Sequence, residues 1–216
     1  LGDVSGGQIV NLAIGGAGAG KVAAGAGIAT SIIVNDVTAS IANGADVAVG
    51  GSLALFAADS SVIDALAFGG AGAGNVAAGV AIGANVITND VTAEIADSDV
   101  TAGNNVALSA TSSSIIRTLA LGASGSGQTA VGVSALGNVV TNRTIARITG
   151  STLSAAGDVS LSARDEAPSI LPGWMLTDEQ QEDVDTALED SPLAPDANIL
   201  ALNVSVAGSG QSAVSA

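Results

Sequence analysis

The clearest candidate for chemistry in this sequence is a glycine-rich stretch, "LAFGGAGAGNVAAG", at residues 66–79. Glycine-rich stretches of this kind are typical of loops that bind phosphate through backbone N–H groups. A phosphate loop occurs once in a domain and is completed by a Lys-Ser or Lys-Thr pair or by a distant acid. Here related stretches also begin at Leu12, Leu119 and, incompletely, Leu202. Because the motif repeats, we interpret it as close sheet packing or a tight corner, not as a nucleotide site.

Few other residues are suited to catalysis or metal binding. The chain has no Cys and no His, which excludes Ser-His and Cys-His nucleophiles and thiolate or imidazole metal sites. Asp97 and Asp99, which we expect on one strand face, would allow carboxylate-only catalysis of the kind used by glycosidases. This pair, or Asp158, would also allow weak Ca²⁺ binding. We interpret the pair as a solvated acidic turn, and we predict no enzyme activity and no cofactor.

Composition favours thin layers of small side chains. Of the 216 residues, 48% are hydrophobic, yet only 1% are aromatic and 29 are Gly. Bulky rings supply much of the buried area in ordinary compact domains, so a core of that kind is hard to build here. The formal net charge of −15 opposes binding to nucleic acid or to anionic lipid. We therefore expect neither of these partners.

The spacing of equivalent glycines shows a repeat with one insertion. Successive separations are 54, 53 and 83 residues (Gly20, Gly74, Gly127 and Gly210). The last interval exceeds one period by 30 residues, and all four prolines lie within that excess. We therefore predict solenoid repeats over 1–164, an acidic Pro-containing insertion over 165–197, and a truncated return to the repeat over 198–216. Neither end carries a polar cap, so we expect further chain or copies that stack end to end.

Alternation with a period of two predicts strands within each repeat. Apolar side chains recur at even positions from Val22 to Val34, and equivalent residues follow Val76. The phase then changes by one residue, which predicts a bulge or turn at each of three asparagines (Asn35, Asn89 and Asn142). Residues 65–88 are uncharged and long enough to span a bilayer, but the period of two and the missing aromatic belt favour strands. We predict an all-β solenoid of about 53-residue repeats stacked as rungs, without membrane insertion.

Charged residues support a model with one rung per repeat. Each arginine of the third repeat occupies a position that an acid holds one repeat earlier. We therefore predict three ion pairs between adjacent rungs, which relieve the repulsion between stacked acids and set the register: Asp64–Arg117, Asp90–Arg143 and Glu94–Arg147. We also expect the three asparagines to form a ladder, each amide bonding the next rung and the local backbone.

The residues "DVSLSA" and "LALGASGSGQTAVGVSALGNVVTNRTIARI" resemble the long repeats of giant secreted bacterial adhesins. The resemblance is to filamentous-haemagglutinin-like and leukotoxin-type filamentous proteins, and it covers everything except the insertion. It implies an extracellular stalk or matrix fibre on the bacterial surface that self-associates and carries adhesive functions, with a host or cell-surface receptor as a possible partner.

The insertion raises an alternative function. Thr177 and Gln180 form a capping box, which predicts a short helix over about 178–189. Apolar residues of the segment before this helix (Trp174, Met175 and Leu176) and of its narrow face (Val184 and Leu188) are candidates for an interface, either with the same solenoid or with a neighbouring subunit. A binding module that uses this insertion is therefore the second function class, and a carbohydrate-active β-helix enzyme is the third.

Overall fold

The computed structural model describes residues 1–166 and 198–216, and these residues are all-β, with no helix. No helix long and apolar enough to cross a membrane was found among them. The strands are β1 (Gly2–Ser5), β2 (Gln8–Ala19), β3 (Val22–Ile41), β4 (Asp46–Val49), β5 (Leu53–Ala73), β6 (Val76–Ala96), β7 (Asp99–Ala102), β8 (Val106–Ser126), β9 (Thr129–Thr149), β10 (Thr152–Ala155), β11 (Val159–Glu166), β12 (Ile199–Ser209) and β13 (Ser212–Ser215).

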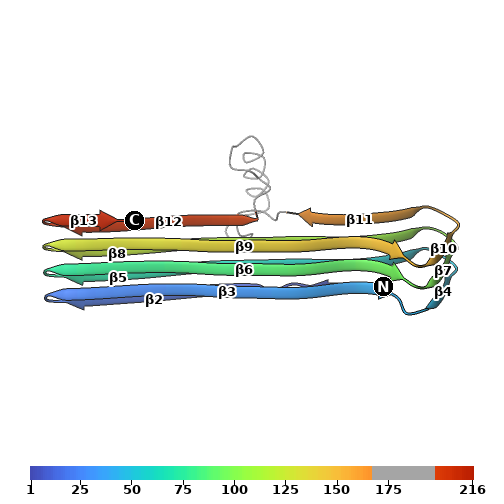
Figure 1. The fold of residues 1–216 in the computed structure, drawn as a ribbon, viewed down its shortest axis with the longest axis horizontal. Coiled ribbons are helices and arrows are strands. Elements are labelled where there is room, and N and C mark those ends of the chain that lie inside the picture. Colours follow the sequence, from blue (N-terminus) through green and yellow to red (C-terminus); the bar gives the residue numbers. More distant parts are fainter. Residues whose placement is uncertain (167–197) are drawn as a thin grey trace, which may run out of the picture.

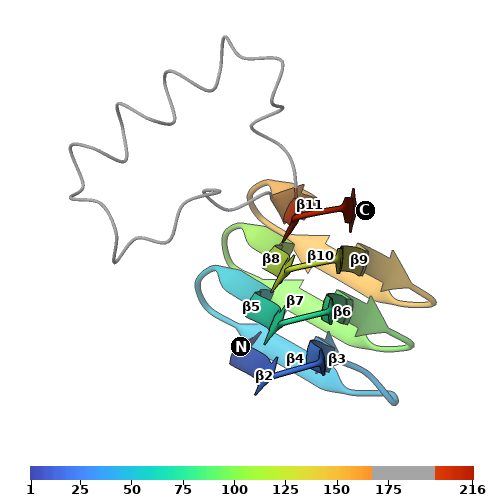
Figure 2. The ribbon, with the colours of Figure 1, turned by 90° about the vertical axis from the view of Figure 1, so that its left-hand side faces the viewer.

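Each repeat forms one rung of a solenoid. In the second rung, β5 leads to a tight turn at Gly74 and Asn75, which reverses the chain direction. β6 then returns antiparallel to β5, and the short strand β7 closes the rung at the end opposite the turn. Rungs stack through parallel pairing into three sheets, as Figure 1 and Figure 2 show. The first sheet holds β1, β2, β5, β8, β11 and β12, the second holds β3, β6, β9 and β13, and the third holds β4, β7 and β10.

The strand register follows the sequence period residue by residue. Val22 pairs with Val76, an offset of 54, and Val76 pairs with Thr129, an offset of 53. On β8 the offset is 53 for β11 and 83 for β12, so the 30 additional residues lie between these two strands. The predicted all-β solenoid is confirmed, and each repeat makes one rung.

The predicted bulge at Asn35, Asn89 and Asn142 is wrong. Strands β3, β6 and β9 run through these positions without interruption, and their pairing continues in register on both sides. In β3 the odd-numbered side chains face inward from Ala23 to Ile41. The hydrophobic phase changes because the interior is thin at one end, where Ala and Gly face inward and larger Val and Ile side chains face solvent.

Glycines allow the first and second sheets to approach closely at one end of the rungs, the glycine end. A Cβ at Gly69 would overlap the carbonyl oxygen of Val80, and one at Gly79 would overlap that of Ala123. The preceding rung has the same relationship between Gly15 and Ala26. The glycine-rich motif therefore serves sheet packing followed by a turn, in agreement with the interpretation of its repetition.

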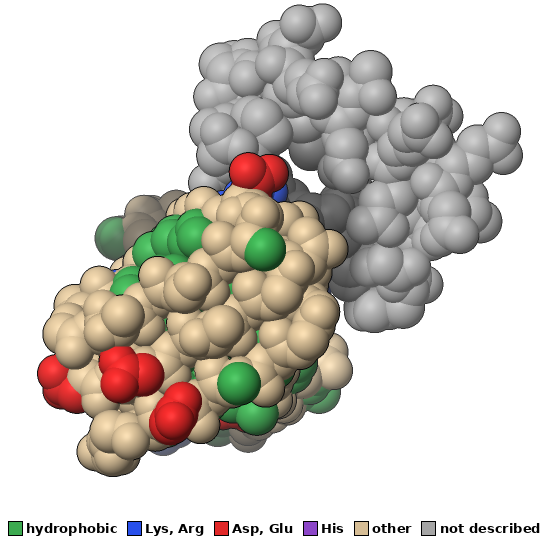
Figure 3. All heavy atoms as spheres, turned by 90° about the vertical axis from the view of Figure 1, so that its right-hand side faces the viewer, with side chains coloured by type: hydrophobic (Ala, Val, Ile, Leu, Met, Phe, Trp, Pro, Cys, Tyr) green, Lys and Arg blue, Asp and Glu red, His purple; other side chains and the backbone are tan. Residues whose placement is uncertain are grey.

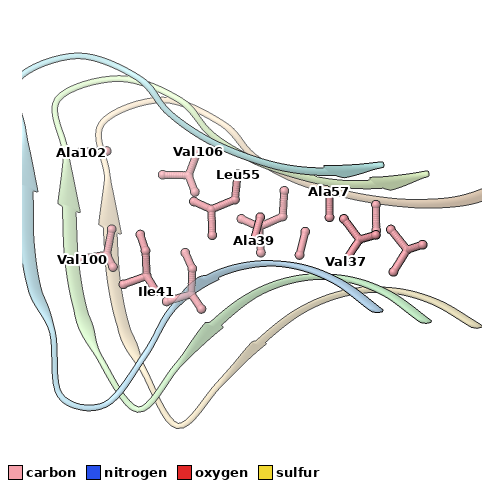
Figure 4. Packing of buried hydrophobic residues seen from close by; sticks show 13 residues of the cluster. Val37, Ala39, Ile41, Leu55, Ala57, Val100, Ala102 and Val106 are labelled. Atoms are coloured by element: carbon pink, nitrogen blue, oxygen red, sulfur yellow. The ribbon is translucent and has the colours of Figure 1, made fainter. Parts of the chain in front are cut away.

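At the opposite end, the third sheet separates the first two sheets and the interior widens. Figure 4 shows the aliphatic cluster that fills this wide end. Val37 and Ile41 from β3 pack with Leu55 from β5 and Val100 from β7, and all are buried. Large side chains thus face inward where the sheets diverge, and glycine faces inward where they converge.

The first segment of the solenoid extends slightly further than predicted. β11 pairs with β8 through Asp165 and Glu166, two residues beyond the expected boundary at 164. The predicted helix over 178–189 and the candidate interface residues, Trp174, Met175, Leu176, Val184 and Leu188, lie outside the described residues.

The close approach of the sheets predicts sharply different effects for two glycine substitutions. Gly69→Ala places a methyl group against the Val80 carbonyl and should lower the free energy of unfolding by about 2 kcal/mol or more. Gly72→Ala, three residues along the same strand, meets nothing within 4 Å and should be neutral or slightly stabilising. Urea unfolding monitored by circular dichroism compares the two variants. Equal destabilisation would contradict the packing role of Gly69.

Candidate functional site

The structure brings all three predicted charge pairs together across adjacent rungs. In the pair on the first sheet, Arg117 Nε lies 2.6 Å from Asp64 Oδ1 and Arg117 Nη2 lies 3.0 Å from Asp64 Oδ2. The two side chains are only 14% and 22% exposed. This bidentate, half-buried geometry fixes the relative position of two neighbouring strands, β5 and β8.

The other two pairs lie on the outside of the second sheet, and their arginines are more open to solvent than Arg117. Arg143 Nη1 lies 2.8 Å from Asp90 Oδ2, and Arg147 Nη2 lies 2.6 Å from Glu94 Oε2. Exposed pairs of this kind contribute little free energy individually. Their effect is that arginines of the third rung compensate the negative charge of acids in the second rung.

A buried aspartate that the sequence analysis did not identify lies at the centre of a polar layer. Asp59 is 2% exposed and accepts hydrogen bonds from the amides of Asn35 and Asn89, both at 2.6 Å. The Ser61 hydroxyl donates a third bond at 2.8 Å. Three donors compensate the desolvation of this carboxylate, which would otherwise carry a large free-energy cost.

The asparagines form part of this layer, and their contacts differ from the predicted ladder. Asn89 Nδ2 reaches Asn142 Oδ1 at 3.3 Å, so one amide-to-amide step is present. Asn35 instead donates to Asp59 and Ser61 of the facing sheet. An ionised carboxylate is a stronger acceptor than an amide oxygen, which explains the preference. The local backbone is not the partner in these bonds.

The layer continues into the fourth rung through Asp165. Asn142 Nδ2 donates to Asp165 Oδ1 at 2.9 Å. In the register of the first sheet, Ser5, Asp59, Ser112 and Asp165 stack in that order. Carboxylates therefore occupy alternate rungs, which prevents direct stacking of like charges.

A second polar layer, also not identified from the sequence, lies nearer the glycine end. The amide of Asn85, which is fully buried, donates to Thr118 at 3.0 Å and to Asn138 at 2.9 Å. In the first rung Asn11 donates to Ser31 at 3.1 Å. The 53-residue spacing of Asn85 and Asn138 is the signal that would have revealed this layer.

The acidic corner residues do not share one strand face as predicted. Asp97 lies in the turn before β7 with a left-handed backbone (φ 47°), and Asp99 begins β7. Asp158 lies in the corner between β10 and β11, where the chain passes from the third sheet to the first. Figure 3 shows acidic side chains on this end of the molecule. Within residues 1–166 and 198–216, no group of three or more acidic side chains is arranged to hold a metal ion.

A shallow groove of about 620 Å³ crosses the outer surface of the first sheet. Four stacked leucines form much of its lining, one from each rung: Leu12, Leu66, Leu119 and Leu202. Asp64 is the only acid among the described residues that line it, and it is already paired with Arg117. The groove can accommodate apolar groups, and it does not bring together two carboxylates.

Comparisons with known proteins add no further assignment, since no family model, curated protein or solved structure matches the chain.

The half-buried ion pair should contribute more to stability than its exposed counterpart. Arg117→Met leaves Asp64 without compensation and should lower the free energy of unfolding by about 2 kcal/mol. Arg143→Met, the matched control, should cost less than about 1 kcal/mol. Urea unfolding measures both, and a cycle that adds Asp64→Asn and the double variant Asp64→Asn/Arg117→Met measures the coupling. A coupling indistinguishable from zero would show that the pair does not stabilise the register.

Removing the buried carboxylate should disrupt the first polar layer. Asp59→Ala leaves the amides of Asn35 and Asn89 without their charged acceptor, so the free energy of unfolding should fall by about 3 kcal/mol. Ser60→Ala, at the adjacent exposed position, should change it by less than about 0.5 kcal/mol. Thermal unfolding followed by calorimetry compares the variants, and an unchanged melting temperature for Asp59→Ala would refute this role.

Proposed function

We propose that this chain is a structural segment of an extracellular bacterial adhesin or matrix fibre, and that it acts as a stalk or filament through rung stacking. The observation that carries the proposal is the unbroken register of all three sheets across successive rungs. Each rung presents the next one with a complete set of backbone donors and acceptors, so the fold extends without a change of design.

The open strand edges support extension by added rungs. In the second sheet the order is β13-β9-β6-β3, so within residues 1–166 and 198–216 β3 has a strand neighbour on one side only. The 20-residue length of β3 makes this edge a long template for a further strand. Further chain or a second molecule in the same register would satisfy its free backbone groups. The proposed self-association into a longer solenoid follows from this edge.

The proposed role is mechanical and adhesive, not catalytic. Rungs joined by parallel backbone pairing and by inter-rung ion pairs form a stiff rod whose strands lie across its axis. Such a rod would hold adhesive parts of a fibre away from the bacterial surface, where a host or cell-surface receptor can be reached. The resemblance to secreted adhesin repeats supports the proposed extracellular location.

Filament dimensions test this proposal. Purified chain, concentrated at neutral pH, should form rods in negative-stain electron microscopy that lengthen with concentration. Oriented samples should diffract at about 4.8 Å along the rod axis, the spacing of adjacent strands. Particles that keep the length of one chain at all concentrations would contradict end-to-end stacking. Specific binding of chain-coated beads to cells, absent with albumin-coated beads, would support the adhesive role.

A further inference from the structure

The outer face of the second sheet carries a broad uncharged surface. It consists of the outward side chains of residues 22–34, 76–88 and 129–141, which we call the apolar face. Every one of these side chains is aliphatic, Thr or Gly. Several large ones are well exposed, including Ile32 at 68% and Val34 at 70%. This sheet faces the viewer in Figure 1.

The size of the apolar face is suited to a specific interface. Three strands of thirteen residues cover roughly 43 Å by 14 Å, or about 600 Å² in projection. Monomeric proteins rarely expose an apolar patch of this extent without using it. Two such faces in contact would bury about 1,200 Å², which reaches the range of stable protein interfaces.

We propose that the apolar face is a contact between two copies of this chain, packed face to face about a two-fold axis along the stacking direction. The inference does not rest on the proposed function, because rung stacking uses strand edges whereas this contact uses a sheet face. Flat sheets pack in this manner about 10 Å apart with their strands aligned.

The pattern of large and small side chains along the strands of the first two rungs is self-complementary. Equivalent residues of the stacked rungs form rows along the stacking direction, such as Ile28 and Ile82. A two-fold axis along this row reverses the strand direction, so a row of one copy faces the row that lies equally far on the other side of the axis in the second copy. Ile32 of one copy then lies opposite Ala24 of the other, and Val86 lies opposite Ala78. In the first two rungs, large side chains therefore meet small ones four residues from the axis, which permits close packing there.

Charge at the ends of the face agrees with this arrangement. The row after Val34 contains Asp36 and Asp90, which would lie opposite the turn after β2 in the other copy. In the first rung that turn contains Lys21, the only lysine in the chain. Asp36 would thus meet an opposite charge, while the apolar rows between carry no charge to desolvate. The net charge of −15 opposes an anionic lipid surface as the occupant of this face.

Cross-linking tests the proposed axis directly, because the chain contains no native cysteine. Position 82 lies on the proposed axis in the central strand, so a short thiol-reactive cross-linker should convert most of the Ile82→Cys variant to covalent dimer. Ala54→Cys, an exposed position on the outer face of the first sheet, is the matched control and should remain monomeric. Equal cross-linking of the two variants would overturn the proposal.

Solution mass provides the second test. Sedimentation velocity from about 1 to 100 μM should show dimers of the native chain. Ile82→Lys should weaken association at least tenfold, while Ile82→Val should have little effect. Both substitutions are on the solvent side, so circular dichroism should show unchanged strand content. A monomeric native chain would overturn the proposal, as would a monomer that binds neutral lipid vesicles through this face. Rod length in micrographs reports on end-to-end stacking separately, so the two proposals can fail independently.

Discussion

In-register stacking is the constraint on which the rest of this structure depends. Each residue in a rung lies one strand spacing, about 4.8 Å, from the equivalent residue of the next rung. A side chain that recurs at the same position in every repeat must therefore pack directly against identical side chains in the adjacent rungs. Glycine and aliphatic side chains meet this condition easily, and Gly15, Gly69 and Gly122 accordingly stack in line. Charged side chains meet it less easily, so runs of stacked like charges are short.

Along the strands, the inward side chains change with the distance between the facing sheets. Glycine and alanine fill the end where the first two sheets nearly touch, and Val37, Leu55 and Val100 fill the end where the third sheet holds them apart. Two polar layers, centred on Asp59 and Asn85, lie at intermediate positions. Because hydrogen bonds are directional, these layers fix one alignment of the facing sheets, whereas aliphatic contacts alone would tolerate sliding.

The period, the all-β class and the three ion pairs were predictable because each leaves a mark at a fixed spacing of 53 or 54 residues. The direction of the side chains was not predictable from hydrophobicity alone. Val22 and Ile28 face solvent, while the smaller Ala23 and Ala29 face inward, because the thin interior excludes large side chains. Pattern reasoning assigns the larger residue to the interior, and this produced the false bulge at Asn35.

Asp59 was not predictable for a related reason. Its equivalents in the neighbouring rungs are Ser5 and Ser112, so no repeating acid marks the position. The alternation of aspartate and serine is itself a consequence of stacking, since carboxylates in adjacent rungs would repel each other across a buried space. The alternation that keeps the buried carboxylates apart therefore also removes the repeating acid by which the position could have been recognised in the sequence.

The same rule limits how alike the repeats can be. Asp36 stacks on Asp90, and the third rung then places Arg143 at that position. Asp46 stacks on Asp99, and Thr152 follows. At both of these stacked positions the run of acids ends after two rungs, which limits the repulsion between carboxylates along the stacking direction. In-register stacking therefore favours repeats that are nearly identical at glycine positions and that differ at charged ones. Sequence divergence at the charged columns is a condition for stacking rather than a loss of the repeat.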